Sequence, residues 1–216
     1  MNYILSKFSH ELRNPLTSLF STVQLIELQH PEVKTFKYWS NIHSDIDYIN
    51  RLINDFSDYS KIETLNLTTF SLHHLLKQLS LSFAASIAYT NVEYTSFIDP
   101  SITQITGDKT KLQEVFLNLL KNAFDAASPD QTICLKAVSS NSEITIFVQD
   151  TGCGMSQKQL ETIFEPFVTY KENGTGLGLF ICKQIITAHG GTLSVTSSIN
   201  QGTTFTVTLP IHTCTL

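Results

Sequence analysis

A histidine beside a carboxylate, on a segment with helical periodicity, is the first arrangement in this sequence that could do chemistry. His10 precedes Glu11, and apolar residues recur at steps of three and four from Leu5 to Ile26. With Leu12 in the apolar seam, His10 is expected to face solvent. A neutral imidazole nitrogen can attack phosphorus, and Glu11 could hold or deprotonate the other ring nitrogen. His10 is a candidate phosphoryl acceptor; the alternative is an ordinary solvated side chain.

Two amides stand one turn apart on a strongly amphipathic segment, residues 109–127, for which Asp108 is the expected N-cap. Asn118 and Asn122 share one face of this predicted helix, at the border of its apolar stripe. Amide oxygens suit Mg²⁺, a hard cation that keeps several waters when it bridges phosphates. The alternative is that both are ordinary polar residues of an amphipathic helix.

A carboxylate and two glycines follow a predicted strand over residues 143–149. Asp150 could accept a hydrogen bond from the amino group of adenine, and Gly152 and Gly154 would let the backbone approach the base. An ordinary Asp-Thr-Gly turn is the competing interpretation. A dinucleotide fingerprint is excluded, because Gln157 stands where its third glycine would be.

A glycine-rich segment leads into a third predicted helix, over residues 176–188, ended by the glycines at 190 and 191. Exposed backbone amides at a helix N-terminus bind phosphate through their donors and the helix dipole. A flexible turn is the alternative. No Gly-x-x-x-x-Gly-Lys-Ser/Thr sequence occurs, which argues against a P-loop enzyme. The segment is Gly174, Thr175, Gly176, Leu177 and Gly178.

The composition is that of an ordinary globular chain. The 216 residues are 42% hydrophobic and 15% charged, and 14 basic against 19 acidic residues give a formal charge of −5, which argues against nucleic-acid binding. No apolar run of about 18 residues occurs, and the first residues lack the long apolar stretch and the small-residue cleavage site of a signal peptide. The four cysteines form no Cys-x-x-Cys pair and are expected to be reduced thiols, not disulfides or zinc ligands.

Two helices must position His10. The stripe over residues 5–26 is followed, after His30-Pro31, by a second stripe over residues 39–56 with heptad-like spacing. A hairpin of about 60 residues cannot bury both stripes alone, so two hairpins are expected to pair into a dimeric four-helix bundle. The alternative is that both stripes pack on the rest of the chain.

Beyond a boundary near residues 61–68 the pattern mixes helices with strands. A short strand and a helix are expected over residues 70–89, with strands over 92–98, 132–138, 143–149, 192–196 and 203–209. The predicted fold class is α+β: a helical hairpin over residues 1–64, followed by an α/β sandwich with a mixed sheet over residues 65–216.

Five short patches in this order resemble the sensor histidine kinases of bacterial two-component systems, over nearly the whole chain. Each patch alone is weak evidence, and their order carries the resemblance. The patches are Phe8-Ser9-His10-Glu11-Leu12-Arg13-Asn14-Pro15-Leu16, Asn118-Leu119-Leu120-Lys121-Asn122-Ala123, Asp150-Thr151-Gly152-Cys153-Gly154-Met155, Phe164-Glu165-Pro166-Phe167 and Gly174-Thr175-Gly176-Leu177-Gly178-Leu179.

The resemblance implies an ATP-dependent protein-histidine kinase with ATP and Mg²⁺ as cofactors. Such a kinase autophosphorylates its histidine, here His10, and passes the phosphoryl group to an aspartate in the receiver domain of a response regulator. It implies a homodimer through the hairpin, a gyrase/Hsp90-like ATP-binding domain, and a phosphatase role for Asn14. It suggests a cytoplasmic location, as a complete protein or as the cytoplasmic part of a longer membrane-bound sensor, with no membrane contact by this stretch.

The resemblance also implies roles for three other residues. Lys171 lies in a short segment that acts as a lid over ATP in similar kinases, and Thr203 matches a threonine near the adenine. Related gyrase-like ATPases carry a water-activating glutamate at the position of Asn118, and an amide there fits transfer to a protein side chain better than hydrolysis. The remaining alternatives are a gyrase/chaperone-type ATPase without an acceptor and a non-catalytic dimeric scaffold.

Overall fold

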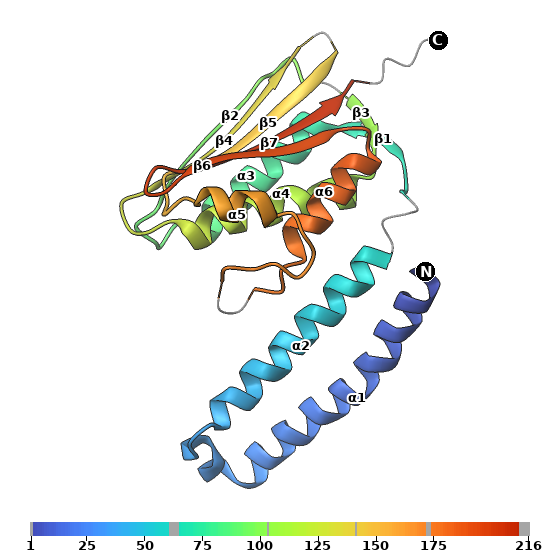
Figure 1. Cartoon of the computed structure of the whole chain (residues 1–216), viewed down its shortest axis with the longest axis vertical. Helices are drawn as coiled ribbons and strands as arrows, with labels where there is room; N and C mark the ends of the chain where they lie inside the picture. Colours follow the sequence, from blue (N-terminus) through green and yellow to red (C-terminus); the bar gives the residue numbers. More distant parts are fainter. Residues whose placement is uncertain (1, 61–64, 103, 141, 172–173, 212–216) are drawn as a thin grey trace.

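The structure, a computed structural model, describes residues 2–60, 65–102, 104–140, 142–171 and 174–211 (Figure 1). For residues 2–10, 55, 56 and 58–60 it describes the backbone alone. The elements are α1 (Asn2–Gln29), the 3-10 helix η1 (Pro31–Thr35), α2 (Trp39–Ser60), β1 (Thr68–Ser71), α3 (Leu72–Ile87), β2 (Glu93–Ile98), β3 (Gln104–Gly107), α4 (Lys109–Ala126), β4 (Thr132–Ser139), β5 (Glu143–Asp150), α5 (Gln157–Thr162), α6 (Gly178–Ala188), β6 (Thr192–Ser198) and β7 (Gly202–Pro210).

Helices α1 and α2 lie side by side as the predicted hairpin (Figure 1). Their contact is a seam of buried residues, Leu16 and Val23 on α1 against Ile46 and Ile53 on α2. The helix α1 continues through Pro15, although proline removes a backbone donor. On α2, Leu52 packs instead against the core of the sheet domain, so the hairpin and that domain are in contact.

The connection between the two helices is held by one carboxylate. Glu27 on α1 accepts a hydrogen bond of 2.8 Å from Trp39 Nε1 and contacts His43 Nε2 at 2.8 Å. These side-chain hydrogen bonds, from Trp39 first and then His43, hold the pKa of Glu27 below its usual value. The carboxylate therefore links the end of α1 to the start of α2 across η1.

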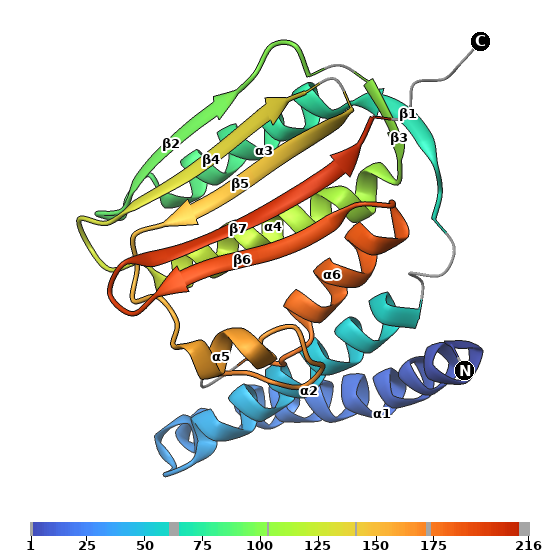
Figure 2. The same ribbon diagram turned by 45° about the horizontal axis from the view of Figure 1, so that its top comes forward.

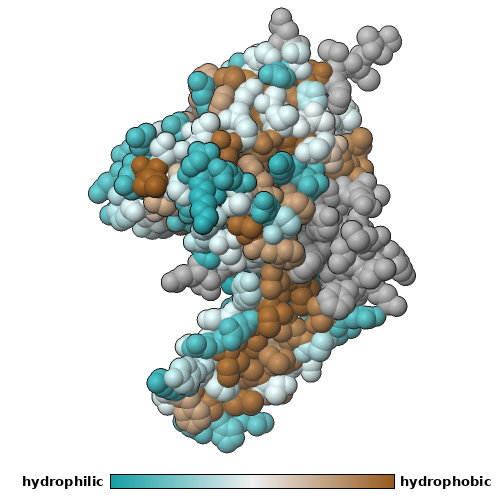
Figure 3. Space-filling model, in the orientation of Figure 1, coloured by the Kyte–Doolittle hydropathy of each residue, from teal (hydrophilic) through white to brown (hydrophobic). Residues whose placement is uncertain are grey.

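A second set of apolar residues on the hairpin remains exposed. Each member lies beside the buried seam, on the same side of its helix. Figure 3 shows apolar surface running along the hairpin below the sheet domain. Part of each apolar stripe is thus unburied within one chain. The set is Leu12, Leu19, Ile26, Ile42 and Ile49.

The second part of the chain is a five-stranded mixed sheet with helices on one face (Figure 2). The strand order is β2-β4-β5-β7-β6, in which β2 and β4 are parallel and the other pairs antiparallel. Helices α3, α4 and α6 supply buried residues to the single core under the sheet. Strands β1 and β3 form a separate two-stranded sheet. The predicted α/β sandwich with a mixed sheet is confirmed.

Most predicted elements occur within a few residues of their expected bounds, and Asp108 caps α4 by accepting from the Lys111 amide at 3.1 Å. Helix α6, however, begins at Gly178 and not at Gly176, because Gly176 has φ +70°, which a right-handed helix excludes. Strand β3 and helix α5 are short and were not predicted from the sequence. Among the described residues, no helix is long and apolar enough to cross a membrane.

His189 joins the end of α6 to the start of α4. Its Nε2 accepts a hydrogen bond of 2.9 Å from the Asp108 amide, and its Nδ1 lies 2.7 Å from the carbonyl of Ile185. With Nε2 accepting, Nδ1 must carry the proton and the ring must be neutral. Gly107 packs on this ring, where a Cβ would meet His189 Cδ2 at 3.0 Å. The buried imidazole therefore fixes the position of α6 against α4.

We predict that His189→Leu lowers the free energy of unfolding by about 2 kcal/mol, because it leaves the buried Asp108 amide without an acceptor. His189→Gln, whose side chain can both accept and donate, should lose less. Urea unfolding followed by circular dichroism measures the difference. A leucine variant as stable as the wild type would contradict this role.

Candidate nucleotide and phosphoacceptor site

The two amides predicted to share a helix face do so on α4. Asn122 Nδ2 donates to Asn118 Oδ1 at 2.8 Å, so the two side chains are held together with Asn122 Oδ1 directed elsewhere. That oxygen accepts from Lys171 Nζ at 2.7 Å. The side-chain oxygen of Asn122, a candidate Mg²⁺ ligand, is thus already hydrogen-bonded to the Lys171 ammonium group. A positive charge therefore fits at this position.

The ammonium group of Lys171 has a second partner that the sequence did not indicate. It lies 2.8 Å from Asp125 Oδ2, one turn after Asn122 on α4. Both groups of this ion pair are partly exposed, so the pair is worth little stability alone. Its consequence is geometric, because it places Lys171 over α4.

Helix α6 begins directly against Asn118. A Cβ on Gly178 would lie 2.6 Å from Asn118 Nδ2, so a larger residue here would displace the Asn118 side chain. Leu177, at the N-cap of α6, is buried and makes no side-chain capping bond. The backbone amides at this N-terminus are therefore positioned to bind an anion next to Asn118.

Asp150 is 2% exposed at the end of β5, on the face of the sheet covered by the helices. Its Oδ1 accepts from the Gly152 amide at 2.8 Å and from the Thr203 amide at 3.2 Å. Burial raises the pKa of this carboxyl above its usual value, and the two backbone amides oppose that rise. The residue is a buried acceptor held by backbone, and not the acid of an exposed turn.

The glycines after β5 are required by close contacts. A Cβ on Gly152 would meet the carbonyl oxygen of Ala126 at 2.4 Å, and Gly154 has φ +65° with a Cβ position 1.9 Å from the oxygen of Ser198. The loop is therefore pressed against the C-terminal end of α4 on one side and against β6 on the other. Asn118 and Ala126 are eight residues apart, or about 12 Å along the helix at its usual rise. One helix thus borders both the Asp150 loop and the start of α6.

The glycine-rich segment, residues 174–178, forms a turn whose backbone conformation requires glycine at position 176. Gly176 has φ +70°, and its carbonyl accepts from the Phe167 amide at 3.0 Å. A Cβ on Gly174 would meet Thr169 Oγ1 at 2.2 Å. Leu177 donates its amide to Thr175 Oγ1 at 3.4 Å. The glycine-rich segment therefore folds back on residues 167–169, beside Lys171.

The predicted acceptor lies on the other part of the chain. The backbone at His10 is in α1, but its side chain lies outside the described residues, so its exposure stays a prediction. Glu11 and Asn14 are exposed on the same helix. Arg13 donates to Asn54 Oδ1 on α2 at 3.0 Å, which links the two helices beside this motif.

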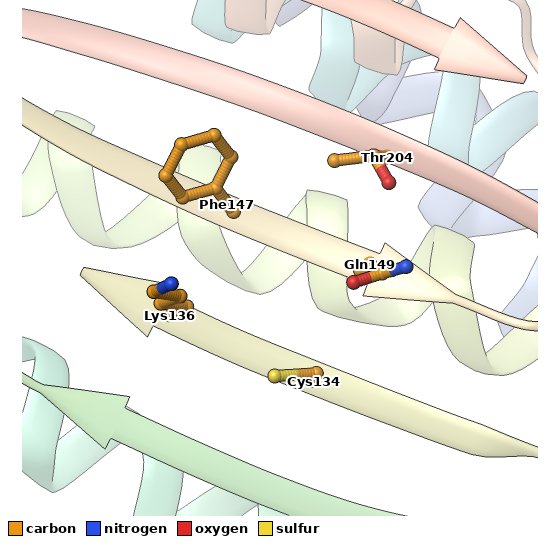
Figure 4. A pocket seen from close by; sticks show the side chains of 5 residues that line it. All are labelled: Cys134, Lys136, Phe147, Gln149 and Thr204. Atoms are coloured by element: carbon orange, nitrogen blue, oxygen red, sulfur yellow. The ribbon is translucent and has the colours of Figure 1, made fainter. Parts of the chain in front are cut away.

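A hollow of about 200 Å³ lies elsewhere, on the opposite face of the sheet (Figure 4). Its residues come from β4, β5 and β7, and none of them belongs to the predicted site. Figure 4 shows α4 behind the strands that carry these side chains. It is an open, shallow surface without a buried acceptor, so we do not assign a nucleotide to it. The lining residues are Cys134, Lys136, Phe147, Gln149 and Thr204.

We predict opposite effects of Asp150→Asn on stability and on nucleotide binding. The variant should be more stable than the wild type as the pH rises above the usual aspartate pKa, because burying the ionised carboxylate costs stability there. The amide oxygen can still accept from Gly152 and Thr203. ATP affinity should fall at least about tenfold, since a charged acceptor is lost.

Thermal unfolding at neutral and at acidic pH and a calorimetric titration with ATP measure both effects. The stability gain should vanish at a pH where the wild-type carboxyl is protonated. An equal loss of stability at every pH would contradict the account of Asp150.

The comparisons with known proteins agree with this geometry. Residues 1–65 match the His Kinase A (phospho-acceptor) domain, and residues 107–213 match the family of histidine kinase-, DNA gyrase B- and HSP90-like ATPases. Sporulation kinase C of Bacillus subtilis (strain 168) is 33% identical over 204 residues, which are 94% of this chain and 47% of the relative. The chain therefore spans less than half of that relative's length.

Two solved structures resemble the chain over nearly its whole length. Full-length ShkA in complex with AMPPNP has a TM-score of 0.79 at 24% identity, over 98% of this chain and 46% of that one, which supports the fold. The histidine kinase ThkA in complex with the response regulator protein TrrA has a TM-score of 0.70 at 25% identity, over 97% of this chain and 61% of that one. The two family matches, over residues 1–65 and 107–213, together with the relatives of which Sporulation kinase C is one, place the chain in the sensor histidine kinases of two-component systems.

Proposed function

We propose that this chain binds ATP with Mg²⁺ and transfers the γ-phosphoryl group to His10. The observation that supports this most strongly is that three segments contact α4. They are the loop after Asp150, Lys171, which donates to Asn122, and the start of α6, which has no side-chain cap. A buried acceptor, cation-binding amides and anion-binding backbone amides are what a nucleoside triphosphate requires.

Each part of the nucleotide would meet a different group. Asp150 accepts from the amino group of adenine, with Gly152, Gly154 and Thr203 beside the base. Asn122 and Asn118 hold Mg²⁺, which neutralises charge on the phosphates. The phosphates lie at the turn before α6, with Lys171 in reach from the lid. Lys171 would leave Asn122 and contact a phosphate. Mg²⁺ would then replace the lysine ammonium group at the same Asn122 oxygen. The phosphate-binding turn is Gly174, Thr175, Gly176, Leu177 and Gly178.

The transfer step forms a P–N bond between an imidazole nitrogen of His10 and the γ-phosphorus. The bond from that phosphorus to the β–γ bridging oxygen breaks, and its electron pair leaves on ADP. The proton on the other ring nitrogen passes to Glu11 or is held by it as positive charge develops. The chain contributes mainly position and charge neutralisation, as phosphoryl transfer requires.

A response regulator would then receive the phosphoryl group on an aspartate of its receiver domain. The ThkA structure is a complex with a response regulator protein, which supports a partner of this class for the present chain. Asn14, exposed one turn after His10, is proposed to position water for dephosphorylation of the regulator. The proposed domains are residues 1–64 and 65–216. The cytoplasmic location stays a prediction.

The hairpin is proposed to dimerise through its exposed seam. The buried seam and the exposed seam lie side by side on both helices, as two hairpins in a four-helix bundle require. His10 would lie on the outside of this bundle, where a nucleotide-binding domain can reach it.

Incubation with γ-labelled ATP and Mg²⁺ tests the proposed function. We expect an acid-labile, alkali-stable label on the wild type and none on His10→Gln. Asn122→Ala should also abolish labelling while leaving a folded dimer. Unlabelled wild type that still hydrolyses ATP would indicate a gyrase-type ATPase, and wild type that binds no ATP would indicate a scaffold.

We predict that Leu19→Glu converts the dimer to a monomer, because it places a charge in the exposed seam. Leu25→Glu is the matched control: at about 100° per residue it lies on the side of α1 opposite Leu16, and it is also exposed. Light scattering coupled to gel filtration measures the mass. If the leucine-25 variant dissociates and the leucine-19 variant does not, the seam is wrongly assigned.

A further inference from the structure

The hydroxyl group of Ser197 connects three segments around the candidate base site. Ser197 Oγ donates to the carbonyl of Gly202 at 2.7 Å and accepts from the Met155 amide at 2.9 Å. It also lies 3.0 Å from Thr203 Oγ1. No motif in the sequence singled out Ser197, which stands in a run of serines and threonines on β6.

Ser197 belongs to a row of polar residues that crosses three neighbouring strands. Asp150 on β5 is the register partner of Thr203 on β7, and Thr203 is the partner of Ser197 on β6. Residues directly opposite each other in antiparallel strands point to the same face. Asp150 and Thr203 are both buried on the face covered by the helices. The row therefore ends at the carboxylate proposed to bind adenine.

The hydrogen bonds of Ser197 determine which of the two hydroxyl groups donates and which accepts. A serine hydroxyl has one proton, and that of Ser197 goes to the Gly202 carbonyl. The contact of 3.0 Å between the two hydroxyls therefore requires Thr203 to donate to Ser197. Thr203 Oγ1 is then left with its lone pairs, so it can only accept from a third group. Without Ser197 the threonine proton would be free to turn toward the site.

We propose that Ser197 is a positioning residue that makes Thr203 an obligate acceptor, so that Thr203 Oγ1 and the carboxylate of Asp150 together select a purine with an amino group at C6, as in adenine. This rests on the proposed function. The exocyclic amino group of adenine supplies two N–H donors, directly or through water, whereas guanine carries a carbonyl oxygen at that position. The guanine carbonyl oxygen would face Thr203 Oγ1 and the Asp150 carboxylate, and none of these acceptors could form a hydrogen bond. Unpaired acceptors are costly in a buried site.

The same hydroxyl also holds the loop after Asp150. Met155 follows Gly154, which has φ +65° and lies against the backbone of Ser198. The hydrogen bond from Met155 to Ser197 keeps this loop on β6. Loss of Ser197 should therefore weaken the binding of any nucleotide a little, and weaken the preference for adenine more.

The test measures dissociation constants of ATP and of GTP, each with Mg²⁺, for four proteins. Relative to wild type, Ser197→Ala should lose about tenfold in ATP affinity and at least about fivefold in the ATP-to-GTP preference, so that GTP affinity falls by about twofold or less. These losses have the size expected for one buried hydrogen bond. Ser197→Thr keeps the hydroxyl and should retain the preference. Ser198→Ala, the exposed neighbour on the same strand, should bind as wild type does.

The outcomes separate this inference from the proposed function. A folded Ser197→Ala protein with an unchanged ATP-to-GTP preference overturns the inference, even if both affinities fall together, because that would be a structural role alone. Wild type that binds neither nucleotide contradicts the proposed function itself.

A second variant decides the case in which Ser197→Ala does not fold. Thr203→Val has nearly the same shape and removes the hydroxyl that Ser197 is proposed to direct. It should lower the ATP-to-GTP preference, with Thr203→Ser as the control that retains it. An unchanged preference in Thr203→Val overturns the inference.

Discussion

A buried carboxylate held by backbone amides is the interaction on which the arrangement of the site depends. Asp150 Oδ1 accepts from Gly152 and Thr203, which joins the end of β5 to the following loop and to β7. Gly202, with φ +86°, must be glycine because a Cβ there would lie 2.0 Å from the carbonyl oxygen of Asp150. The strand ends and the loop are thus packed around one charge whose burial raises its own pKa. Burying the ionised Asp150 carboxylate lowers the stability of the fold, and such a cost is common at binding sites.

Helix α4 organises the rest of the site around that carboxylate. The C-terminal end of α4 contacts the Asp150 loop at Ala126 and Lys171 through Asn122 and Asp125, and its middle contacts the start of α6 at Asn118. His189 then fixes the other end of α6 to the start of α4. The turn proposed to bind phosphate leads into α6 where that helix contacts Asn118. The Lys171 ammonium contacts Asn122 Oδ1 and Asp125 Oδ2 on α4, and a metal ion could take its place at these oxygens.

Features that depend on local sequence patterns could be predicted from the sequence. Contacts between residues far apart in the chain could not. The helices, most strands, the cap at Asp108 and the shared face of Asn118 and Asn122 follow from periodicity and spacing, and the structure confirms them. The roles of Asp125, His189 and Ser197 could not be predicted, because their partners are 46, 81 and 42 residues away. No local signal distinguishes such a histidine or serine from its neighbours. The exposure of His10 stays a prediction.

The most direct test of the account is a titration of the chain with ATP and Mg²⁺, followed through the backbone amide resonances. The account predicts that the largest shifts occur at Gly152 and Thr203, which donate to Asp150, and at the first residues of α6. Residues of the opposite sheet face, such as Phe147 and Gln149, should change little. Large shifts around Phe147 with none at Gly152 and Thr203 would place the nucleotide on the wrong face of the sheet for this mechanism and contradict the account.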